Sequence, residues 1–332
     1  MHAPTTDVLR QQLEDRRSRL AGAIQTTGSD EQLVLLLRQV DSALSQLGTD
    51  DYGLCLVCKE HVSEQDLLGN PLLRYCLCDL TPEQLRTLEN DLELARRIQG
   101  ALLPDPVLHA PGWETYYRYE PAGPVSGDYC DLWTHADDDR TLYFAVGDVS
   151  GKGVAASLLM SHLQAAFRSL AGVGLPLAQL VHRVNRQLLQ ATLPSHYATL
   201  VVGRANADGS VELVNAGHCP PLIVRRSEVE SLGATGFPLG LLDDRPYEVD
   251  QLRLREGESL VLYTDGLTEA RGADGDEFGQ ERVEQLLRSQ RGAAPKTLVQ
   301  AMRGGLASFL GESRRTDDLT MLVLSRANGR VS

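Results

Sequence analysis

The chain has 332 residues, of which 42% are hydrophobic and 23% are charged, a balance typical of a globular protein with more than one domain. The formal net charge is −13, so the chain lacks the basic surface with which proteins bind nucleic acid directly. Its apolar runs are far shorter than the roughly 20 residues that span a bilayer, and its N-terminus does not resemble a secretory signal. We therefore expect a cytoplasmic protein whose cysteines are reduced or metal-bound.

A helical hairpin is predicted for residues 1–50. Apolar residues recur at helical spacing from Thr6 to Gln25 and again from Glu31 to Leu47. A polar, glycine-containing stretch separates the two runs, and Gly48 is well placed to end the second helix. The alternative is a pair of ordinary helices in a small bundle.

Four of the six cysteines follow the hairpin closely. Cys55 and Cys58 form one pair, and Cys76 and Cys78 form a second pair after 17 intervening residues. Two thiolate pairs at this spacing are typical of a tetrahedral structural zinc site. The second pair has one residue between its cysteines instead of two, so either Cys78 or Asp79 completes the site. Reduced, buried cysteines are the alternative.

Residues 5–90 resemble the DksA/TraR zinc-finger family. The hairpin is followed by an aspartate-rich turn, Thr49-Asp50-Asp51-Tyr52-Gly53, and then by the two cysteine pairs. The resemblance implies a zinc finger at residues 51–81 that binds Zn²⁺. It also implies an alternative function, a protein that binds RNA polymerase or another partner, although the hairpin is short for that role.

One linker helix is predicted over residues 82–104. Thr81 is placed as its N-cap and Pro82 as its first helical residue, while Pro104 follows its end. Apolar residues recur at heptad spacing, at Leu85, Leu88, Leu92, Ala95 and Leu102. Heptad spacing favours a seam between two helices and hence a homodimer. Packing of a single helix on the next domain is the alternative.

Residues 105–332 mix strand-like and helix-like runs. Strands are predicted at Leu142–Val146, Ala198–Gly203, Val211–Asn215, Leu222–Val224, Ser259–Thr264 and Leu319–Leu324. Helices are predicted at Val154–Ala171, Leu177–Thr192, Gln280–Arg288 and Lys296–Leu310. Short turns between several strands favour antiparallel pairing, so the predicted class is α+β.

Acidic residues lie beside glycine or at strand ends in four places of this region. They are Asp128 after Gly127, Asp148 after Gly147, Asp265 before Gly266, and the pair Asp317-Asp318 before the last strand. Clustered carboxylates do not all remain ionised without a cation. Oxygen ligands favour Mg²⁺ or Mn²⁺ over zinc. Each Asp-Gly pair taken alone is commonly a turn.

The flanks of these aspartates resemble the metal-dependent phosphatases of the protein phosphatase 2C-like superfamily, in particular the SpoIIE/RsbU branch. Seven stretches match in order: 94–104, 119–131, 147–160, 215–221, 238–241, 262–270 and 316–320. The resemblance implies two antiparallel sheets flanked by helices, an αββα sandwich, over residues 105–332. It also implies a metal-activated water that attacks phosphoserine or phosphothreonine.

The resemblance further implies ligands for two Mn²⁺ or Mg²⁺ ions. Asp148 bridges the ions, with help from the Val149 carbonyl; Asp128 holds one of them, and Asp265 and Asp317 hold the other. If the register of the last pair shifts by one, Asp318 replaces Asp317. Asp131 is a candidate for support of the site.

The substrate implied by the branch is a phosphorylated anti-anti-sigma-type protein, and the helix before the catalytic domain is implied to act as a switch. A phosphatase of small phosphate compounds is the alternative that the residues do not separate. His218 is interpreted as a structural histidine, and Cys130 and Cys219 as buried thiols. Lys152 is either solvated or a contact for substrate phosphate.

Overall fold

The computed structural model describes residues 3–27, 31–49, 51–55, 61–73, 82–135, 138–191, 196–243, 245–313 and 315–327. By its internal contacts the chain divides into two compact units. One comprises Met1–Glu93 with Thr192–His196, and the other comprises Leu94–Ala191 with Tyr197–Ser332. No helix within the described ranges is both long and apolar enough to cross a membrane.

The first unit contains the predicted hairpin. Helix α1 covers Ala3–Thr27 and α2 covers Glu31–Gln46, and both pack through leucines at helical spacing. The buried apolar side chains of the two helices are Leu9, Leu13, Leu20, Leu33, Leu36, Val40 and Ala43. Across the pair, Arg17 Nε donates to Asp41 Oδ1 at 2.6 Å. Two packed helices therefore lie where the hairpin is predicted, and the assignment of this hairpin to a zinc-finger module stays a prediction.

A short helix follows in the same unit. Helix α3 spans Glu64–Gly69, and the Ser63 hydroxyl oxygen accepts a hydrogen bond from the Asp66 amide at 3.1 Å as its N-cap. Leu67 of this helix is buried against Gly53, where a Cβ would lie 2.8 Å from the leucine side chain. Helix α3 therefore packs closely against Gly53, which lies just before Cys55.

The linker helix is also present. Helix α4 spans Pro82–Leu102, so the predicted helix is confirmed, while its predicted N-cap, Thr81, lies outside the described residues. The second unit begins at Leu94 and thus includes the last turns of α4. In that unit, Gln164 Nε2 donates to the Leu102 carbonyl at 2.6 Å, which satisfies one of the free carbonyls at the helix end.

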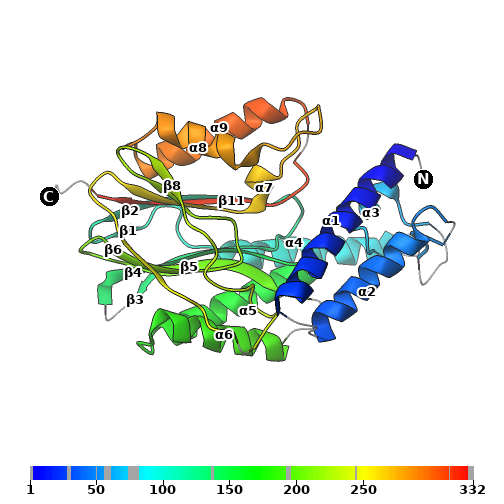
Figure 1. Cartoon of the computed structure of the whole chain (residues 1–332), viewed down its shortest axis with the longest axis horizontal. Coiled ribbons are helices and arrows are strands. Elements are labelled where there is room, and N and C mark those ends of the chain that lie inside the picture. The colour runs from blue at the N-terminus through cyan, green and yellow to red at the C-terminus, as the bar shows by residue number, and fades with distance from the viewer. Residues whose placement is uncertain are drawn as a thin grey trace. The chain divides into compact units, whose positions relative to one another are not determined.

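The second unit is a sandwich of two antiparallel sheets with helices on both outer faces (Figure 1). One sheet has the order β1-β2-β11-β10-β7-β8 and the other has the order β3-β4-β5-β6-β9. The strands of the first are β1 His109–Ala110, β2 Trp113–Glu120, β7 Leu222–Val224, β8 Val229–Ser231, β10 Ser259–Tyr263 and β11 Leu319–Arg326. Those of the second are β3 Asp128–His135, β4 Asp138–Val149, β5 Ala198–Asn206, β6 Ser210–Ala216 and β9 Asp250–Arg253.

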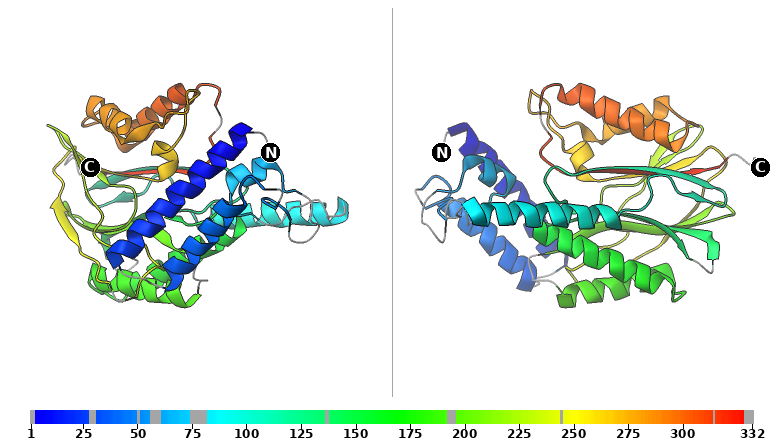
Figure 2. Two further views of the ribbon diagram at one scale, coloured as in Figure 1. Left: turned by 45° about the vertical axis from the view of Figure 1, so that its right-hand side comes forward. Right: turned by 180° about the vertical axis from the view of Figure 1, so that it is seen from behind.

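The helices cover the two sheets separately. Helices α8 (Gly279–Ser289) and α9 (Pro295–Leu310) lie on the first sheet, and α5 (Val154–Ala171) and α6 (Leu177–Ala191) lie on the second. Seen from behind, the two helix pairs lie on opposite outer faces (Figure 2). A third core cluster fills the space between the sheets. The predicted α+β class and two-sheet arrangement are therefore confirmed.

Candidate metal centre

The period-2 alternation of the strands places four polar side chains at one end of the space between the sheets. In β3, Cys130 and Leu132 belong to the core between the sheets, so Asp128 faces the same way. Asp148 of β4 lies directly opposite Asp128 in the antiparallel register. From the other sheet, Thr264 follows β10 and Thr320 lies in β11, both with their hydroxyls at this end.

Asp128 links the two sheets. Its side chain is only 1% exposed, and its Oδ2 accepts hydrogen bonds from Thr264 Oγ1 at 3.0 Å and Thr320 Oγ1 at 2.5 Å. The two threonines also contact one another, because the Thr320 amide donates to Thr264 Oγ1 at 3.0 Å. Hydrogen bonds to a carboxylate are strong ones, so the sandwich itself fixes the position of Asp128.

Two glycines allow the acidic segments to approach one another. A Cβ on Gly127 would lie 3.3 Å from Asp148 Oδ1 and 3.1 Å from the Val149 carbonyl oxygen. A Cβ on Gly266 would lie 1.8 Å from the Asp318 carbonyl oxygen, a distance that no side chain tolerates. The short helix α7, Asp265–Thr268, therefore lies directly against the segment that contains Asp317. Asp-Gly at these positions meets a packing requirement in addition to forming a turn.

The last acidic pair has two distinct roles. Both carboxylate oxygens of Asp318 accept backbone hydrogen bonds, from the Ala122 amide at 2.7 Å and the Gly127 amide at 3.0 Å. Asp317 is about half exposed, and its Oδ1 lies 3.1 Å from Lys152 Nζ. Asp318 thus holds the loop before β3, and Asp317 is the member of the pair with a carboxylate available to an ion.

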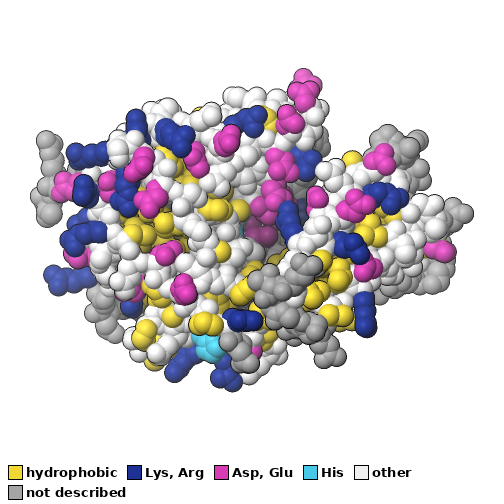
Figure 3. All heavy atoms as spheres, in the orientation of Figure 1, with side chains coloured by type: hydrophobic (Ala, Val, Ile, Leu, Met, Phe, Trp, Pro, Cys, Tyr) yellow, Lys and Arg dark blue, Asp and Glu magenta, His cyan; other side chains and the backbone are white. Residues whose placement is uncertain are grey.

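The local charge is unfavourable without a cation. Burial raises the pKa of Asp128 well above its usual value, and the nearby Asp318 raises it further. Burial likewise raises the pKa of Asp148, and Asp128, Asp265 and Asp317 add to that effect. Acidic side chains also gather on the surface over α7 (Figure 3). A divalent cation would relieve this repulsion.

The residues fit a hard cation that keeps part of its water shell. In the described part of the chain, no group of three or more His, Cys, Asp or Glu side chains is arranged to hold a metal ion. Mg²⁺ is usually held by one or two carboxylates and several waters, and the oxygen donors here suit it and Mn²⁺. Asp128, Asp148 and the Val149 carbonyl lie on the buried side of the cluster, whereas Asp265 and Asp317 lie on its outer side.

Asp131 does not join this cluster. It lies on the opposite face of β3, where Arg168 of α5 donates from Nε at 2.9 Å and from Nη2 at 2.6 Å to its two carboxylate oxygens. Tyr129 and Trp133 on the same face pack against α5 and α6. An odd separation from Asp128 in a strand puts Asp131 on the helix-covered face, so it attaches α5 to the sheet.

Three further sequence candidates lie near the cluster or within the core. Burial and the neighbouring Asp265 raise the pKa of the Cys219 thiol, so this cysteine lies close to the acidic residues. Cys130 is buried between the sheets. His218 is buried, and its Nδ1 lies 2.8 Å from Thr199 Oγ1, which fits a structural histidine. Burial lowers the pKa of His218 to about 4, so the ring is neutral.

Gln99 of α4 is a further residue of this site, and the sequence alone assigns it no role. It is 5% exposed, its Nε2 donates to the Ser126 carbonyl at 2.7 Å, and its Oε1 accepts from the Ser126 amide at 3.0 Å. Ser126 Oγ in turn accepts from the Asp128 amide at 3.0 Å. Helix α4 is thereby connected to Asp128 through one residue. The sequence signal for this role is a polar residue, Gln99, between Ala95 and Leu102, where the heptad spacing would place an apolar one.

The predicted zinc site lies mostly outside the described residues. Cys55 is described and is buried, whereas Cys58, Cys76, Cys78 and the alternative ligand Asp79 are outside the described ranges. The zinc prediction therefore stays a prediction.

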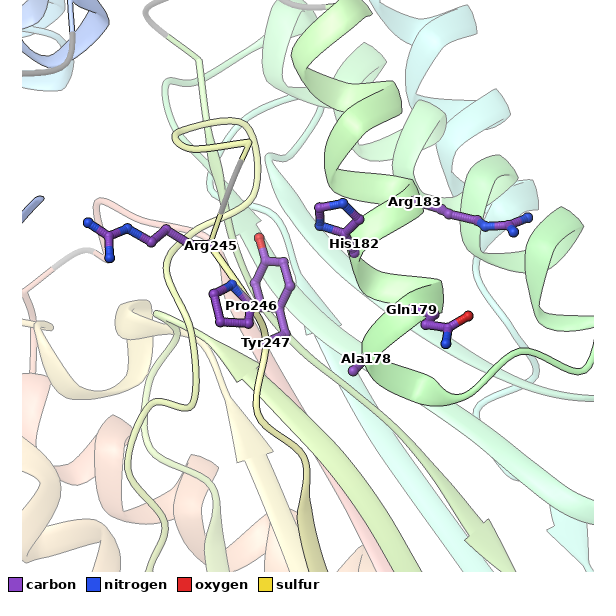
Figure 4. A pocket seen from close by; sticks show the side chains of 7 residues that line it. All are labelled: Ala178, Gln179, His182, Arg183, Arg245, Pro246 and Tyr247. Atoms are coloured by element: carbon purple, nitrogen blue, oxygen red, sulfur yellow. The ribbon is translucent and has the colours of Figure 1, made fainter.

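A depression of about 540 Å³ lies elsewhere on the second unit. Its lining comes from the start of α6 and from the segment before β9, and consists of Ala178, Gln179, His182, Arg183, Arg245, Pro246 and Tyr247. The guanidinium groups of Arg183 and Arg245 extend away from one another on opposite sides of the depression (Figure 4). Because they do not converge, they do not form a site for one anion.

Comparisons with known proteins agree with this geometry. The family model "Stage II sporulation protein E (SpoIIE)" matches residues 138–327. Protein IcfG of Synechocystis is 27% identical over 326 residues, which cover 88% of this chain and 51% of IcfG. The phosphoserine phosphatase RsbU of Bacillus subtilis is 27% identical over 242 residues, which cover 72% of this chain and 71% of RsbU. The chain thus spans about half the length of IcfG.

One solved structure adds a match of the fold. The RsbU and RsbW domains of Rv1364c from Mycobacterium tuberculosis are similar with a TM-score of 0.57 and 28% identity. The match covers 67% of this chain and 61% of that chain.

Proposed function

The chain belongs to the SpoIIE family, because the family model matches more than half of it, and we propose that it is a metal-dependent protein serine/threonine phosphatase. The observation that carries the proposal is the Asp128–Asp148 pair. The buried carboxylate of Asp128 and the partly buried carboxylate of Asp148 lie opposite one another in β3 and β4, both with raised pKa values. A bound divalent cation is the simplest chemical reason to keep them together.

Five groups would hold the metal ions. Asp148 would bridge two Mn²⁺ or Mg²⁺ ions with help from the Val149 carbonyl, Asp128 would contribute to one ion, and Asp265 and Asp317 to the other. When bound, such ions clamp a phosphate and lower the pKa of a water so that it can attack phosphorus.

The protein's own residues supply orientation. Thr264 and Thr320 both donate to Asp128 Oδ2, so they fix the orientation of this carboxylate. Gly127 and Gly266 let the backbone of each acidic segment approach its neighbour without a clash. Because a metal-activated water would be the nucleophile, the proposed reaction requires no serine or cysteine nucleophile. Cys219 is therefore given no role as a nucleophile.

The proposed substrate is a phosphorylated anti-anti-sigma-type protein. Two observations support this choice: RsbU of Bacillus subtilis is named a phosphoserine phosphatase, and the similar Rv1364c structure contains an RsbU domain together with an RsbW domain. A small phosphate compound remains the competing substrate class, and comparing turnover of a phosphoprotein with that of small phosphates separates the two.

The activity is tested by phosphate release from an aryl phosphate by the metal-free full-length chain, with and without added Mn²⁺. We expect release that requires Mn²⁺ and falls at least about 100-fold in Asp148→Asn. The matched control is Asp243→Asn, which changes an exposed aspartate outside the cluster. Metal-independent release, or full release by Asp148→Asn, would exclude the proposed mechanism.

We also propose that the N-terminal part regulates the enzyme through α4. The cysteine pairs would bind Zn²⁺, and the heptad seam of α4, in which Leu85 is exposed and Leu88 and Leu92 are partly exposed, would support a homodimer. The direct support for coupling is the pair of hydrogen bonds from Gln99 to Ser126. A shift of α4 would move Ser126 and, with it, the Asp128 amide.

This regulatory proposal is tested by replacing Leu88 and Leu92 with glutamate. We expect a loss of dimer in sedimentation together with a change in Mn²⁺-dependent turnover. A demonstrated monomer with unchanged turnover would reject coupling through α4, and retention of the dimer would reject the seam.

A further inference from the structure

The ammonium group of Lys152 contacts one carboxylate of the acidic cluster. Its Nζ lies 3.1 Å from Asp317 Oδ1 and donates to the Thr316 carbonyl at 3.1 Å. The lysine belongs to the loop between β4 and α5, so it follows the Asp148-Val149 segment closely. Gly151 and Gly153 on either side of it adopt φ of 100° and 77°, which gives this loop a backbone path that L side chains rarely adopt.

Asp317 is the carboxylate that this ammonium occupies. The Asp317 Oδ1 also accepts the Asp318 amide at 3.0 Å. Its neighbour Asp318 uses both oxygens on backbone amides, so it does not share the lysine. Asp128 and Asp148, by contrast, make no ion pair within the described residues, and burial raises their pKa values. One side of the cluster thus has a built-in positive charge and the other side does not.

We propose that Lys152 competes with a metal cation for Asp317, so that it sets how tightly the outer ion binds. This inference rests on the proposed function, because it concerns the same carboxylates. The ammonium and a divalent ion cannot both occupy Asp317 Oδ1 at bonding distance without repulsion. Binding of the outer ion at this oxygen therefore requires the lysine to leave.

The exposure of the pair limits the size of the effect. The side chains of Lys152 and Asp317 are 45% and 47% exposed, and ion pairs of this kind contribute little to stability. Removing the competing charge should therefore tighten metal binding by a factor of about two to five, not by orders of magnitude. The lysine would act as a weak, reversible counter-ion and not as a block.

The test is a titration of the metal-free full-length chain with Mn²⁺, in which free Mn²⁺ is followed by electron paramagnetic resonance. Lys152→Met should bind the weaker ion about two- to fivefold more tightly than the wild type, and Lys152→Arg should resemble the wild type. Lys296→Met is the matched control, because it removes one positive charge from α9, where Lys296 Nζ lies 5.9 Å from the Tyr116 ring.

The same titration in an Asp317→Asn background isolates the pair. There the Lys152→Met change should have no further effect, since the competition has been removed. Equal tightening in both backgrounds, or equal tightening by Lys296→Met, would mean that only general charge matters and would overturn the inference. Unchanged or weaker binding by Lys152→Met would also overturn it, with the proposed function intact. Absence of Mn²⁺ binding by the wild type would reject the proposed function itself.

Discussion

The buried and exposed flanks of the carboxylate cluster are held in different ways. On the buried flank, Asp128 is held by hydroxyls from the opposite sheet and lies opposite Asp148 in the strand register. On the exposed flank, Asp317 makes a half-exposed ion pair with Lys152 and accepts a hydrogen bond from the next residue along the chain. The two flanks would nevertheless serve one reaction.

The difference separates a part of the site that forms with the fold from a part that can adjust. Buried hydrogen bonds to a charged group are costly to break, whereas exposed ion pairs are worth little and are screened by salt. Substitutions on the buried flank should therefore have large effects on stability and metal binding. Substitutions on the exposed flank should have small effects. Three predictions test this contrast.

The largest effect is expected for Gly266→Ala, which affects the backbone between the flanks. An added Cβ would lie 1.8 Å from the Asp318 carbonyl oxygen, so Asp265 or Asp317 must move. We expect a loss of stability of about 3 kcal/mol and at least about 100-fold lower Mn²⁺-dependent turnover, measured by urea unfolding and aryl phosphate release. Gly233→Ala is the control, because no atom lies within 4 Å of its Cβ position. Equal behaviour of the two variants would contradict the packing argument.

A smaller effect is expected for Thr320→Val on the buried flank. The change keeps the side-chain shape but removes the 2.5 Å hydrogen bond to Asp128. Hydrogen bonds to charged groups contribute about 2 kcal/mol, and we expect that loss in urea unfolding of the metal-free chain, together with weaker Mn²⁺ binding. Thr141→Val, whose hydroxyl donates to the amide oxygen of Asn206 at 3.3 Å, should cost less and leave Mn²⁺ binding unchanged. A similar cost at both sites would show that Asp128 is not specially held.

The smallest effect is a pH dependence from His218, which contacts Thr199 beside β4. Burial lowers the folded-state pKa to about 4, below the ordinary value of about 6.5. The unfolded chain therefore binds the proton first, and stability is lost as pH falls from about 6.5 toward 4. Between pH 7 and pH 5 this amounts to about 1.8 kcal/mol.

The measurement compares urea unfolding of the wild type and His218→Gln at pH 7 and pH 5. The variant should lose about 1.8 kcal/mol less than the wild type over this interval. Taking the difference between the two proteins removes the opposite contribution of Asp128 and Asp148, whose raised pKa values favour the folded state at lower pH. Equal losses would mean that His218 is not buried in its neutral form.

Much of the site could be predicted because its signals are local. Aspartates beside glycine mark Asp148 and Asp265, and the strands that precede them are continuous apolar runs, residues 142–146 and 260–263, bounded by such turns. The antiparallel pairing of β5 and β6 also followed from the turn between them, and the structure has that pairing. These features depend on neighbours within a few residues.

Other parts depend on tertiary contacts that the sequence does not display. Strand β3 was not predicted, because buried aspartates are unusual in strands and become tolerable only through Arg168 and the two threonines. Its neighbour in the other sheet, β2, alternates buried and exposed side chains, and that alternation was a usable signal. The separate roles of Asp317 and Asp318 depend on the amides of Ala122 and Gly127, almost 200 residues away in the chain.

The hydrogen bonds between Gln99 and Ser126 fix the rotation of the end of α4 about its own axis within the second unit. An α-helix turns by about 100° and rises by 1.5 Å per residue, so a slip of one residue would present Ile98 or Gly100 in place of Gln99. Neither has a side-chain amide, so neither could donate and accept at once through its side chain as Gln99 does. The end of α4 can therefore shift only in steps of one residue, each with its own rotation and translation. Only the step that places Gln99 opposite Ser126 supports the loop before Asp128.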